Sequence, residues 1–187
     1  RSAVAMALLA AAATGALAAG GTWRERSQLA WDAAAGQLAR ETVRAWDAHP
    51  ELGLDFVWEP AEGRTDAGAI EGRGRLLWLA RGAPAYDRDA IFSEYEGEVR
   101  DGRPEGRGKI RLKSGLVYDG TWRDGVMTGY GVLRFATGDR YSGAVRDGAP
   151  DGRGRYAALD GTIFEGIFVA GQRDGFHCQH GAAGREE

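Results

Sequence analysis

Residues 95–117 read YEGEVRDGRPEGRGKIRLKSGLV, and the pattern of this 23-residue stretch returns in the residues that follow it. Its opening triplet Tyr95-Glu96-Gly97 recurs at the same spacing as Tyr118-Asp119-Gly120, Tyr141-Ser142-Gly143 and Phe164-Glu165-Gly166. Columns of glycine keep the same register, for example Gly102, Gly125, Gly148 and Gly171. Self-similarity at a fixed period indicates a repeat architecture in which each unit is one supersecondary element.

Each unit contains two short stretches in which apolar or glycine positions alternate with mostly polar ones. In the second unit these positions are Tyr118, Gly120 and Trp122, and then Gly129, Gly131, Leu133 and Phe135. A period of two indicates β-strands. Turn-forming residues follow each stretch, namely Arg123-Asp124-Gly125 and Thr137-Gly138-Asp139. The sequence therefore predicts two strands and two turns in every repeat.

A three-residue hairpin loop centred on Gly115, and on the equivalent positions of the other units, gives a predicted strand register. This register places Tyr141 opposite Phe135 and Gly143 opposite Leu133, and by the same rule it places Gly154 opposite Phe168. Glycines would then tend to face bulky residues, whose side chains could cover the exposed backbone. A pairing shifted by an odd number of residues would contradict this hypothesis, because every side chain would change face.

The repeat closely resembles the MORN family, whose units read roughly Tyr-x-Gly-x-Trp-x-x-Gly, then Gly-x-Gly, then a turn. The resemblance covers residues 95–175, with three complete units over 95–163 and a fourth that opens at Phe164. Val99 and Val145 replace the usual tryptophan, and the fourth unit loses its Gly-x-Gly, as is typical of a terminal repeat. The resemblance implies a mainly β fold, with an elongated, twisted, single-layer sheet of stacked hairpins. It also implies scaffolding, dimerisation or membrane association.

Residues 50–94 are interpreted as a degenerate first repeat that contains an insertion. Gly72–Leu79 looks like the second half of a unit, and Leu54–Trp58 could form a strand that leads into it. The insertion spans Arg81–Asp89. This repeat would extend the sheet towards the N-terminus, whereas residues 176–187 are expected to form a flexible tail.

Residues 1–19 are predicted to direct the chain into or through a membrane. The stretch from Ala3 to Ala19 carries no charge and is mostly alanine, so it is short and weakly apolar for a membrane-spanning helix. Ala16-Leu17-Ala18 supplies a small-x-small cleavage pattern, which favours a secretory signal. An uncleaved anchor and an alanine-rich packed helix stay open as alternatives. The expected location is the cell envelope, either periplasmic or secreted after cleavage or membrane-anchored without it.

An amphipathic α-helix is predicted over residues 22–49. Thr22 and Glu25 match a capping box at its start, and Pro50 would stop it. Apolar residues fall near one face at helical spacing, namely Trp31, Ala35, Leu38, Ala45 and Trp46. We expect this helix to pack on its own domain and cover part of the apolar face of the sheet. A partner-binding or membrane-surface helix is the alternative.

Two faces of the predicted sheet are candidate binding surfaces. The apolar face, if a helix or a second copy leaves it open, would form a groove for a peptide, a lipid chain or a subunit. Its residues are Tyr95, Tyr118, Trp122, Leu133, Phe135, Tyr141, Tyr156, Phe164 and Phe168. The polar face carries cations that would attract an anionic membrane surface, although acidic neighbours make a mixed solubilising surface the simpler reading. These cations are Arg107, Lys109, Arg111, Arg123, Arg134, Arg146, Arg153 and Arg155.

The sequence gives little support to catalysis or to a metal site. His177, Cys178 and His180 offer three ligands, whereas a structural zinc site normally has four in recognisable pairs. The Gly-x-Gly copies lack the lysine and the following helix of a phosphate-binding loop. Glu96 and Glu98 lack the apolar pocket that acid–base catalysis requires. We therefore expect no catalytic residue, cofactor or metal, and the formal net charge of −3 does not suggest a nucleic acid partner.

The sequence favours a non-catalytic scaffold of the cell envelope that mediates protein–protein or membrane association. A protein partner is expected, an anionic membrane surface is a second candidate, and a homodimer is allowed. One alternative is a carbohydrate- or peptidoglycan-binding module, because exposed rings could stack on sugars. Another alternative is an accessory subunit of a separately encoded enzyme.

Overall fold

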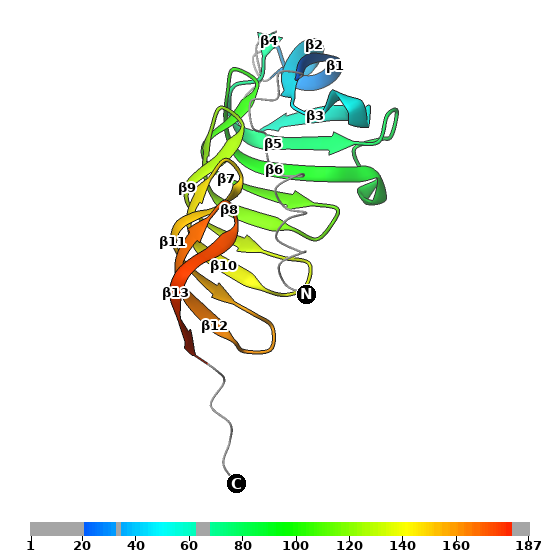
Figure 1. The fold of residues 1–187 in the computed structure, drawn as a ribbon. Coiled ribbons are helices and arrows are strands. Elements are labelled where there is room, and N and C mark those ends of the chain that lie inside the picture. Colours follow the sequence, from blue (N-terminus) through cyan, green and yellow to red (C-terminus); the bar gives the residue numbers. More distant parts are fainter. Residues whose placement is uncertain (1–20, 33–34, 63–67, 181–187) are drawn as a thin grey trace. The chain divides into compact units, whose positions relative to one another are not determined.

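The computed structural model describes the backbone of residues 21–32, 35–62 and 68–180, and the side chains of these ranges up to residue 174. Most of the described chain is β-strand, and the helical pieces within it are the 3-10 turns η1 (Pro50–Leu52) and η2 (Arg88–Ala90). Figure 1 shows consecutive hairpins along the chain. The prediction of a mainly β protein built from hairpins is confirmed.

The strands are numbered in the order in which they occur in the sequence, and Figure 1 labels them in the same way. They are β1 (Thr22–Asp32), β2 (Gln37–Asp47), β3 (Asp55–Pro60), β4 (Gly68–Ala69), β5 (Gly72–Leu79), β6 (Ile91–Arg100), β7 (Arg103–Leu112), β8 (Val117–Arg123), β9 (Val126–Arg134), β10 (Arg140–Arg146), β11 (Ala149–Ala157), β12 (Ile163–Val169) and β13 (Gln172–His180). Contacts divide them into two units, which are described separately. The N-terminal unit holds the described residues up to 113 together with Trp122–Gly125, and the C-terminal unit holds residues 114–121 and those from 126 onward.

Within the range predicted as a helix, 22–49, the described residues 22–32 and 37–47 form two paired β-strands instead, so that prediction is wrong. β1 and β2 pair antiparallel from Thr22 opposite Asp47 to Asp32 opposite Gln37, without a register shift. β4 adds to the other side of β2 as a short parallel partner, which gives the order β1-β2-β4. Thr22, which was expected to cap a helix, opens β1.

Burial along β2 explains why this segment is a strand. Val43 and Ala45 are fully buried and share their face with Glu41 and Asp47, whereas Thr42 and Arg44 lie on the opposite face. A helical reading places Ala45 beside Leu38 and Trp46, but a period of two separates Ala45 from both. The turn at Gly36, where φ is 65°, supplies the break between the strands.

In the N-terminal unit, β3, β5, β6 and β7 form an antiparallel sheet in that order. β3 and β5 lie where the sequence analysis expected the strands of a degenerate first repeat. The residues between β5 and β6 form turns and η2, at the position of the predicted insertion. In the C-terminal unit, β8 to β13 follow one another as hydrogen-bonded neighbours in sequence order.

The predicted strand register is wrong by two residues, although the faces are right. Tyr141 lies opposite Leu133 rather than Phe135, and Gly143 lies opposite Gly131. The three-residue loop exists, but it comprises residues 136–138, because the amide of Phe135 donates to the carbonyl of Asp139 at 2.9 Å. The loop centre is therefore one residue earlier than expected, with glycine in its last position at a φ of 92°. An even shift keeps every side chain on its predicted face.

Glycines consequently face glycines, and the rings cover them from the neighbouring row. One row runs Gly74, Gly97 and Gly108 across β5, β6 and β7, and another runs Gly131, Gly143, Gly154 and Gly166 across β9 to β12. The next row contains Leu76, Tyr95 and Ile110 in the first case, and Leu133, Tyr141, Tyr156 and Phe164 in the second. A Cβ at Gly108 or Gly154 would collide with the ring of Tyr95 or Tyr141, respectively. Because these positions carry no side chain, each tyrosine ring can pack directly against the backbone of the sheet.

Successive two-residue turns are tied to one another through their backbones. The second residue of each turn donates its amide to a carbonyl of the preceding hairpin: Gly102 to Ile70 (3.0 Å), Gly125 to Pro104 (2.9 Å), Gly148 to Met127 (3.0 Å) and Gly171 to Pro150 (2.8 Å). A carboxylate often accepts from the first residue of the turn, as Glu71 does from Asp101 (2.8 Å) and Glu105 does from Asp124 (2.9 Å). Ile70 and Glu71 therefore make the same two contacts as Pro104 and Glu105. Residues 70–74 thus behave as part of a repeat.

Candidate binding surface

The apolar side chains that the sequence analysis assigned to a binding face lie in the cores of the sheets. Tyr95, Tyr118, Trp122, Leu133, Phe135, Tyr141, Tyr156 and Phe168 are buried, and Phe164 is half-buried. Within the described ranges, they fill the space above the glycine rows without a covering helix. The described residues therefore hold no open groove of these rings, because the rings form the internal packing of the repeats.

Hydrogen bonds fix the buried tyrosines in this position. The hydroxyl of Tyr95 donates to the carbonyl of Glu98 at 2.7 Å, and that of Tyr141 donates to the carbonyl of Ala144 at 2.7 Å. Tyr118 makes the corresponding bond to Thr121 at 3.0 Å. Burial raises the pKa of Tyr118 and of Tyr141 to about 12, so both stay neutral donors over a wide pH range.

Edge-to-face contacts join rings that are 27 residues apart in the sequence. The ring centroids of Tyr95 and Trp122 are 5.2 Å apart with an interplanar angle of 82°, and those of Tyr141 and Phe168 are 5.0 Å apart at 79°. The indole of Trp122 also donates to the carbonyl of Gly108 at 3.1 Å. Rings engaged in this way stabilise the repeats and leave no free face for stacking on a ligand.

The predicted basic residues do not form an uninterrupted stripe within either unit. In the N-terminal unit, Lys109 and Arg111 lie opposite Glu96 and Glu94 across β6 and β7. In the C-terminal unit, Arg155 pairs with Glu165 at 3.0 Å and Arg146 pairs with Asp151 at 3.2 Å. The remaining basic residues of the prediction are exposed, namely Arg107, Arg123, Arg134 and Arg153. The arrangement is that of a mixed surface in which carboxylates alternate with cations.

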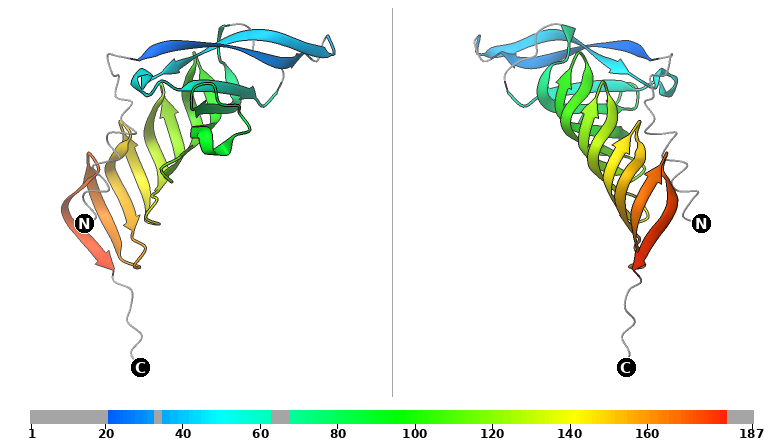
Figure 2. Two further views of the ribbon diagram at one scale, coloured as in Figure 1. Left: turned by 90° about the vertical axis from the view of Figure 1, so that its right-hand side faces the viewer. Right: turned by 60° about the vertical axis from the view of Figure 1, so that its left-hand side comes forward.

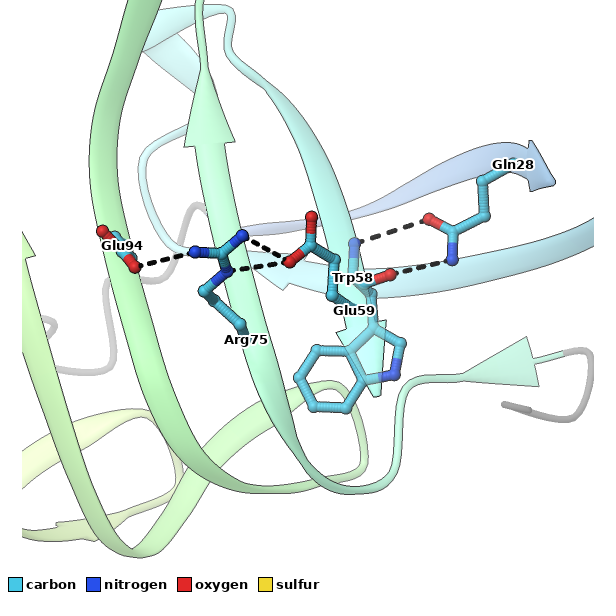
Figure 3. Close-up of polar contacts among 5 residues, drawn as sticks. All are labelled: Gln28, Trp58, Glu59, Arg75 and Glu94. Atoms are coloured by element: carbon cyan, nitrogen blue, oxygen red, sulfur yellow. Dashed lines mark hydrogen bonds and ion pairs between the residues drawn. The ribbon is translucent and has the colours of Figure 1, made fainter. Parts of the chain in front are cut away.

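A charged cluster crosses β3, β5 and β6 in the N-terminal unit (Figure 3). The guanidinium of Arg75 lies 2.6 Å from a carboxylate oxygen of Glu59 and 3.4 Å from one of Glu94. The hydrogen bond to Glu59 is the main reason why the pKa of Arg75 is raised. Because these charges satisfy one another at a partly exposed position, the cluster joins strands and offers no spare reactive group.

Metal binding gains no support from the part of the chain whose side chains are described. No group of three or more histidine, cysteine, aspartate or glutamate side chains there could hold a metal ion. The side chains of His177, Cys178 and His180, weighed above as candidate ligands, lie outside the described residues. Residues 1–20, which carry the predicted signal or anchor, also lie outside them.

The base of the β1–β2 hairpin packs on the first two-residue turn of the repeats. The amide of Trp46 donates to the carbonyl of Gly102 at 3.0 Å, and the guanidinium of Arg103 lies 4.5 Å from the centroid of a Trp46 ring. Trp23 meets Trp46 edge to face at 5.6 Å and lies so close to Gly102 that a Cβ there would overlap its ring. These contacts hold the start of β1 and the end of β2.

At the middle of the hairpin, the side-chain amide of Gln28 contacts the backbone of β3 (Figure 3). The Nε2 of Gln28 donates to the carbonyl of Trp58 at 2.9 Å, and its Oε1 accepts from the Trp58 amide at 3.4 Å. The same Nε2 lies 2.8 Å from a carboxylate oxygen of Glu41. Gln28 thus takes the place of a neighbouring strand and covers backbone groups at the edge of β3.

Beyond these contacts the hairpin exposes large apolar side chains. Leu29, Trp31 and Leu38 are 60%, 58% and 62% exposed. Trp31 lies directly opposite Leu38, and the register places Leu29 on the same face. Figure 2 shows the far end of the hairpin, in blue, projecting past β3 and β5. We call Leu29, Trp31 and Leu38 the tip cluster.

The tip cluster was not among the candidate sites that the sequence analysis named. Trp31 and Leu38 are large, exposed apolar residues that lie directly opposite each other, an arrangement that no other pair of the described residues shows. The helical interpretation places both on a buried face. The signal that could have located them is the alternation of polar and apolar residues over Thr42, Val43, Arg44 and Ala45, which is typical of a strand.

The family comparison addresses the part of the chain that contains the glycine rows. Residues 95–117, 118–140, 141–163 and 164–176 each match the family model of the MORN repeat. Residues 95–176 are four consecutive MORN repeats. The predicted family is confirmed, and no curated protein matches the chain as a relative.

The MORN repeats indicate a repeat-based binding or scaffold protein, and the MORN family is generally non-catalytic. Within the described ranges, no helix has the length and apolar character required to cross a bilayer. The four repeats exclude the β1–β2 hairpin, so the tip cluster is a feature that this chain adds to the repeats.

Proposed function

We propose that this protein is a non-catalytic MORN-repeat scaffold of the cell envelope, which attaches to its partner through the tip cluster. The observation that carries the proposal is the contrast in exposure between the rings that cover the glycine rows of the repeats and the side chains of the tip cluster. These repeat rings are buried or, for Phe164, half-buried, whereas Leu29, Trp31 and Leu38 face solvent on a hairpin that Gln28 and Trp46 hold in place. Exposed apolar side chains grouped on one face are typical of an interaction site.

The cell-envelope location rests on residues 1–19, whose composition suits a secretory signal or an anchor. Burial of the repeat rings weakens the alternative of a sugar-binding module that would use those rings. The repeats instead supply a structural frame within each unit, because ring-to-glycine packing and the ties between turns recur there.

The test compares two full-length triple variants for retention of components from a solubilised native envelope fraction. In one, Leu29, Trp31 and Leu38 are replaced by serine. In the matched control, three exposed apolar residues from elsewhere are replaced by serine, namely Tyr86, Tyr130 and Leu159. Circular dichroism and thermal unfolding confirm that both variants are folded.

We expect a specific set of envelope components to be retained by the wild type and by the control, and to be lost from the tip variant. Equal retention by all three proteins, or loss in the control alone, would remove the tip cluster from the proposed function.

A further inference from the structure

We infer that the tip cluster inserts into the interfacial layer of a phospholipid bilayer, with the neighbouring arginines at anionic head groups. The inference rests on the proposed function and names a lipid surface as the partner. It concerns the β1–β2 hairpin and assigns no lipid contact to the repeats.

The first argument is the chemistry of the outward face of the hairpin. The register puts Leu29, Trp31 and Leu38 on this face, together with Arg40 and Arg44. Trp23 and Trp46 share the face at the base of the hairpin, where they pack on the first two-residue turn. Glu25 is the one carboxylate among the described residues of this face, so cations outnumber anions there. Arg44 lies over the Trp23 ring at 4.9 Å, which joins a cation to an aromatic side chain. Tryptophan with leucine and arginine is the composition of segments that lie at membrane interfaces.

Some charged groups on the inward face of the hairpin, by contrast, have partners within the protein. There Arg24 is ion-paired with Asp47 at 2.9 Å, and Glu41 accepts from Gln28. Arg24, Asp47 and Glu41 of the inward face are thus engaged within the protein, whereas Arg40 is exposed beside the tip cluster. Uncompensated positive charge beside exposed tryptophan complements the negative surface of an anionic bilayer.

The second argument is size. A stable protein–protein interface buries roughly 800 Å² on each partner and involves about 20–30 residues a side. The tip cluster consists of three side chains at the end of a narrow hairpin. Shallow insertion into a bilayer needs no complementary surface of that size, because each apolar side chain gains from leaving water independently.

The third argument is the sequence that precedes the hairpin. The uncharged, apolar stretch from Ala3 to Ala19 ends three residues before β1 begins at Thr22. If this segment acts as the uncleaved anchor, the first strand starts at a bilayer surface, and the outward face lies within reach of head groups. An uncleaved anchor and the tip cluster would thus both contact a lipid bilayer.

The experiment measures quenching of tryptophan fluorescence by vesicles that contain brominated phospholipids, with full-length protein. Vesicles contain either phosphatidylglycerol with phosphatidylcholine, or phosphatidylcholine alone. The wild type is compared with Trp31→Phe, and the matched control is Trp122→Phe, which alters a buried indole in the repeats. Since residues 1–19 are present in every protein, their own affinity for the vesicles does not distinguish the variants.

We expect phosphatidylglycerol vesicles to quench the wild type and the Trp122→Phe variant. Trp31→Phe should lose most of the quenching, and added salt should reduce it in all cases. Equal quenching of the wild type and Trp31→Phe, or no quenching of the wild type, would overturn the inference even if the proteins float with the vesicles.

A second measurement distinguishes the failure of this inference from the failure of the proposed function. Sedimentation velocity is recorded for the wild type and for the variant with Leu29, Trp31 and Leu38 replaced by serine. A wild-type dimer that the tip variant abolishes, combined with absent quenching, would assign the cluster to a second copy. Loss of envelope components without Trp31 quenching would assign it to a protein partner. Either result would keep a binding role for the tip cluster and reject the lipid surface.

Discussion

At the residue scale, the fold depends on glycines that leave room for tyrosine rings. Gly131 and Gly143 lie opposite each other, and the ring of Tyr118 rests against Gly131. The sequence predicted that rings would shield glycine backbone, and this is how the repeats are packed. It did not predict glycine opposite glycine, because the register depends on where the three-residue loop is centred.

We predict that Gly131→Ala will lower the free energy of unfolding by about 3 kcal/mol, since the new methyl group would overlap the Tyr118 ring. Gly36→Ala is the control, because Gly36 has a φ of 65° but no atom lies within 4 Å of the position that a Cβ would take there. It should cost only the backbone strain of about 1 kcal/mol. Equal losses in urea unfolding would show that ring packing does not require glycine at position 131.

The buried tyrosines should make the protein sensitive to high pH. Tyr118 and Tyr141 have folded-state pKa values of about 12 against an ordinary value of 10.0. Because the folded state favours the neutral form, their contribution to stability is complete below pH 10 and is lost as the pH rises from 10 to 12. We expect the free energy of unfolding to fall across this window and to fall less in the Tyr118→Phe/Tyr141→Phe double variant. An identical slope in both proteins would contradict this origin.

At the element scale, the first residue of the two-residue turn is aspartate in three repeats and alanine in the fourth. Asp101, Asp124 and Asp147 begin two-residue turns with φ near 50°, and Ala170 occupies the same position in the fourth repeat with a φ of 46°. Aspartate tolerates this left-handed conformation better than alanine does. The fourth repeat therefore holds its turn at a higher conformational cost.

Replacing Ala170 by glycine should raise the free energy of unfolding by up to about 1 kcal/mol, because glycine adopts a positive φ without strain. The amide of Ala170 that donates to Asp151 at 3.2 Å is retained. Ala157→Gly, at a paired position of β11, is the comparison and should lower stability. Destabilisation of both variants in thermal unfolding would contradict the cost assigned to this turn.

Gln28 joins the β1–β2 hairpin to β3 through the backbone of Trp58. Gln28→Ala would leave the amide and carbonyl of Trp58 without this partner, and we expect a loss of about 1–3 kcal/mol in the free energy of unfolding. Gln37→Ala is a matched control on the same hairpin, because Gln37 is exposed at the start of β2. Its change should stay within about 0.5 kcal/mol. Comparable effects of the two substitutions would argue against a bridging role for Gln28.

The hairpin also shows where sequence reasoning failed and why. Residues 95–175 could be read correctly because the glycine and aromatic columns recur in phase, so each unit supports the interpretation of the others. Residues 22–49 have no such copy, and apolar residues at positions 31, 35, 38, 45 and 46 fit a helix nearly as well as a strand. The exposure of Trp31 and Leu38 depends on how far the hairpin extends beyond β3. Local pattern gives no information about that distance.

At the scale of the whole molecule, structural and contact roles are divided between different aromatic side chains. The repeats bury the rings that cover the glycine rows and tie their turns, so these residues specify the frame. The hairpin precedes the repeats and presents the tip cluster. This division could not be read from composition, because all six tryptophans of the chain are equivalent candidates in the sequence.

The measurement that tests this division most directly is oxidative footprinting of the tryptophans in the free, full-length protein, resolved by mass spectrometry. We predict that Trp31, which is 58% exposed, will react fastest, followed by Trp23. Trp58 and Trp122 should be protected until the protein unfolds. Oxidation of Trp122 as rapid as that of Trp31, under native conditions, would show that the repeat rings are open and would contradict the account.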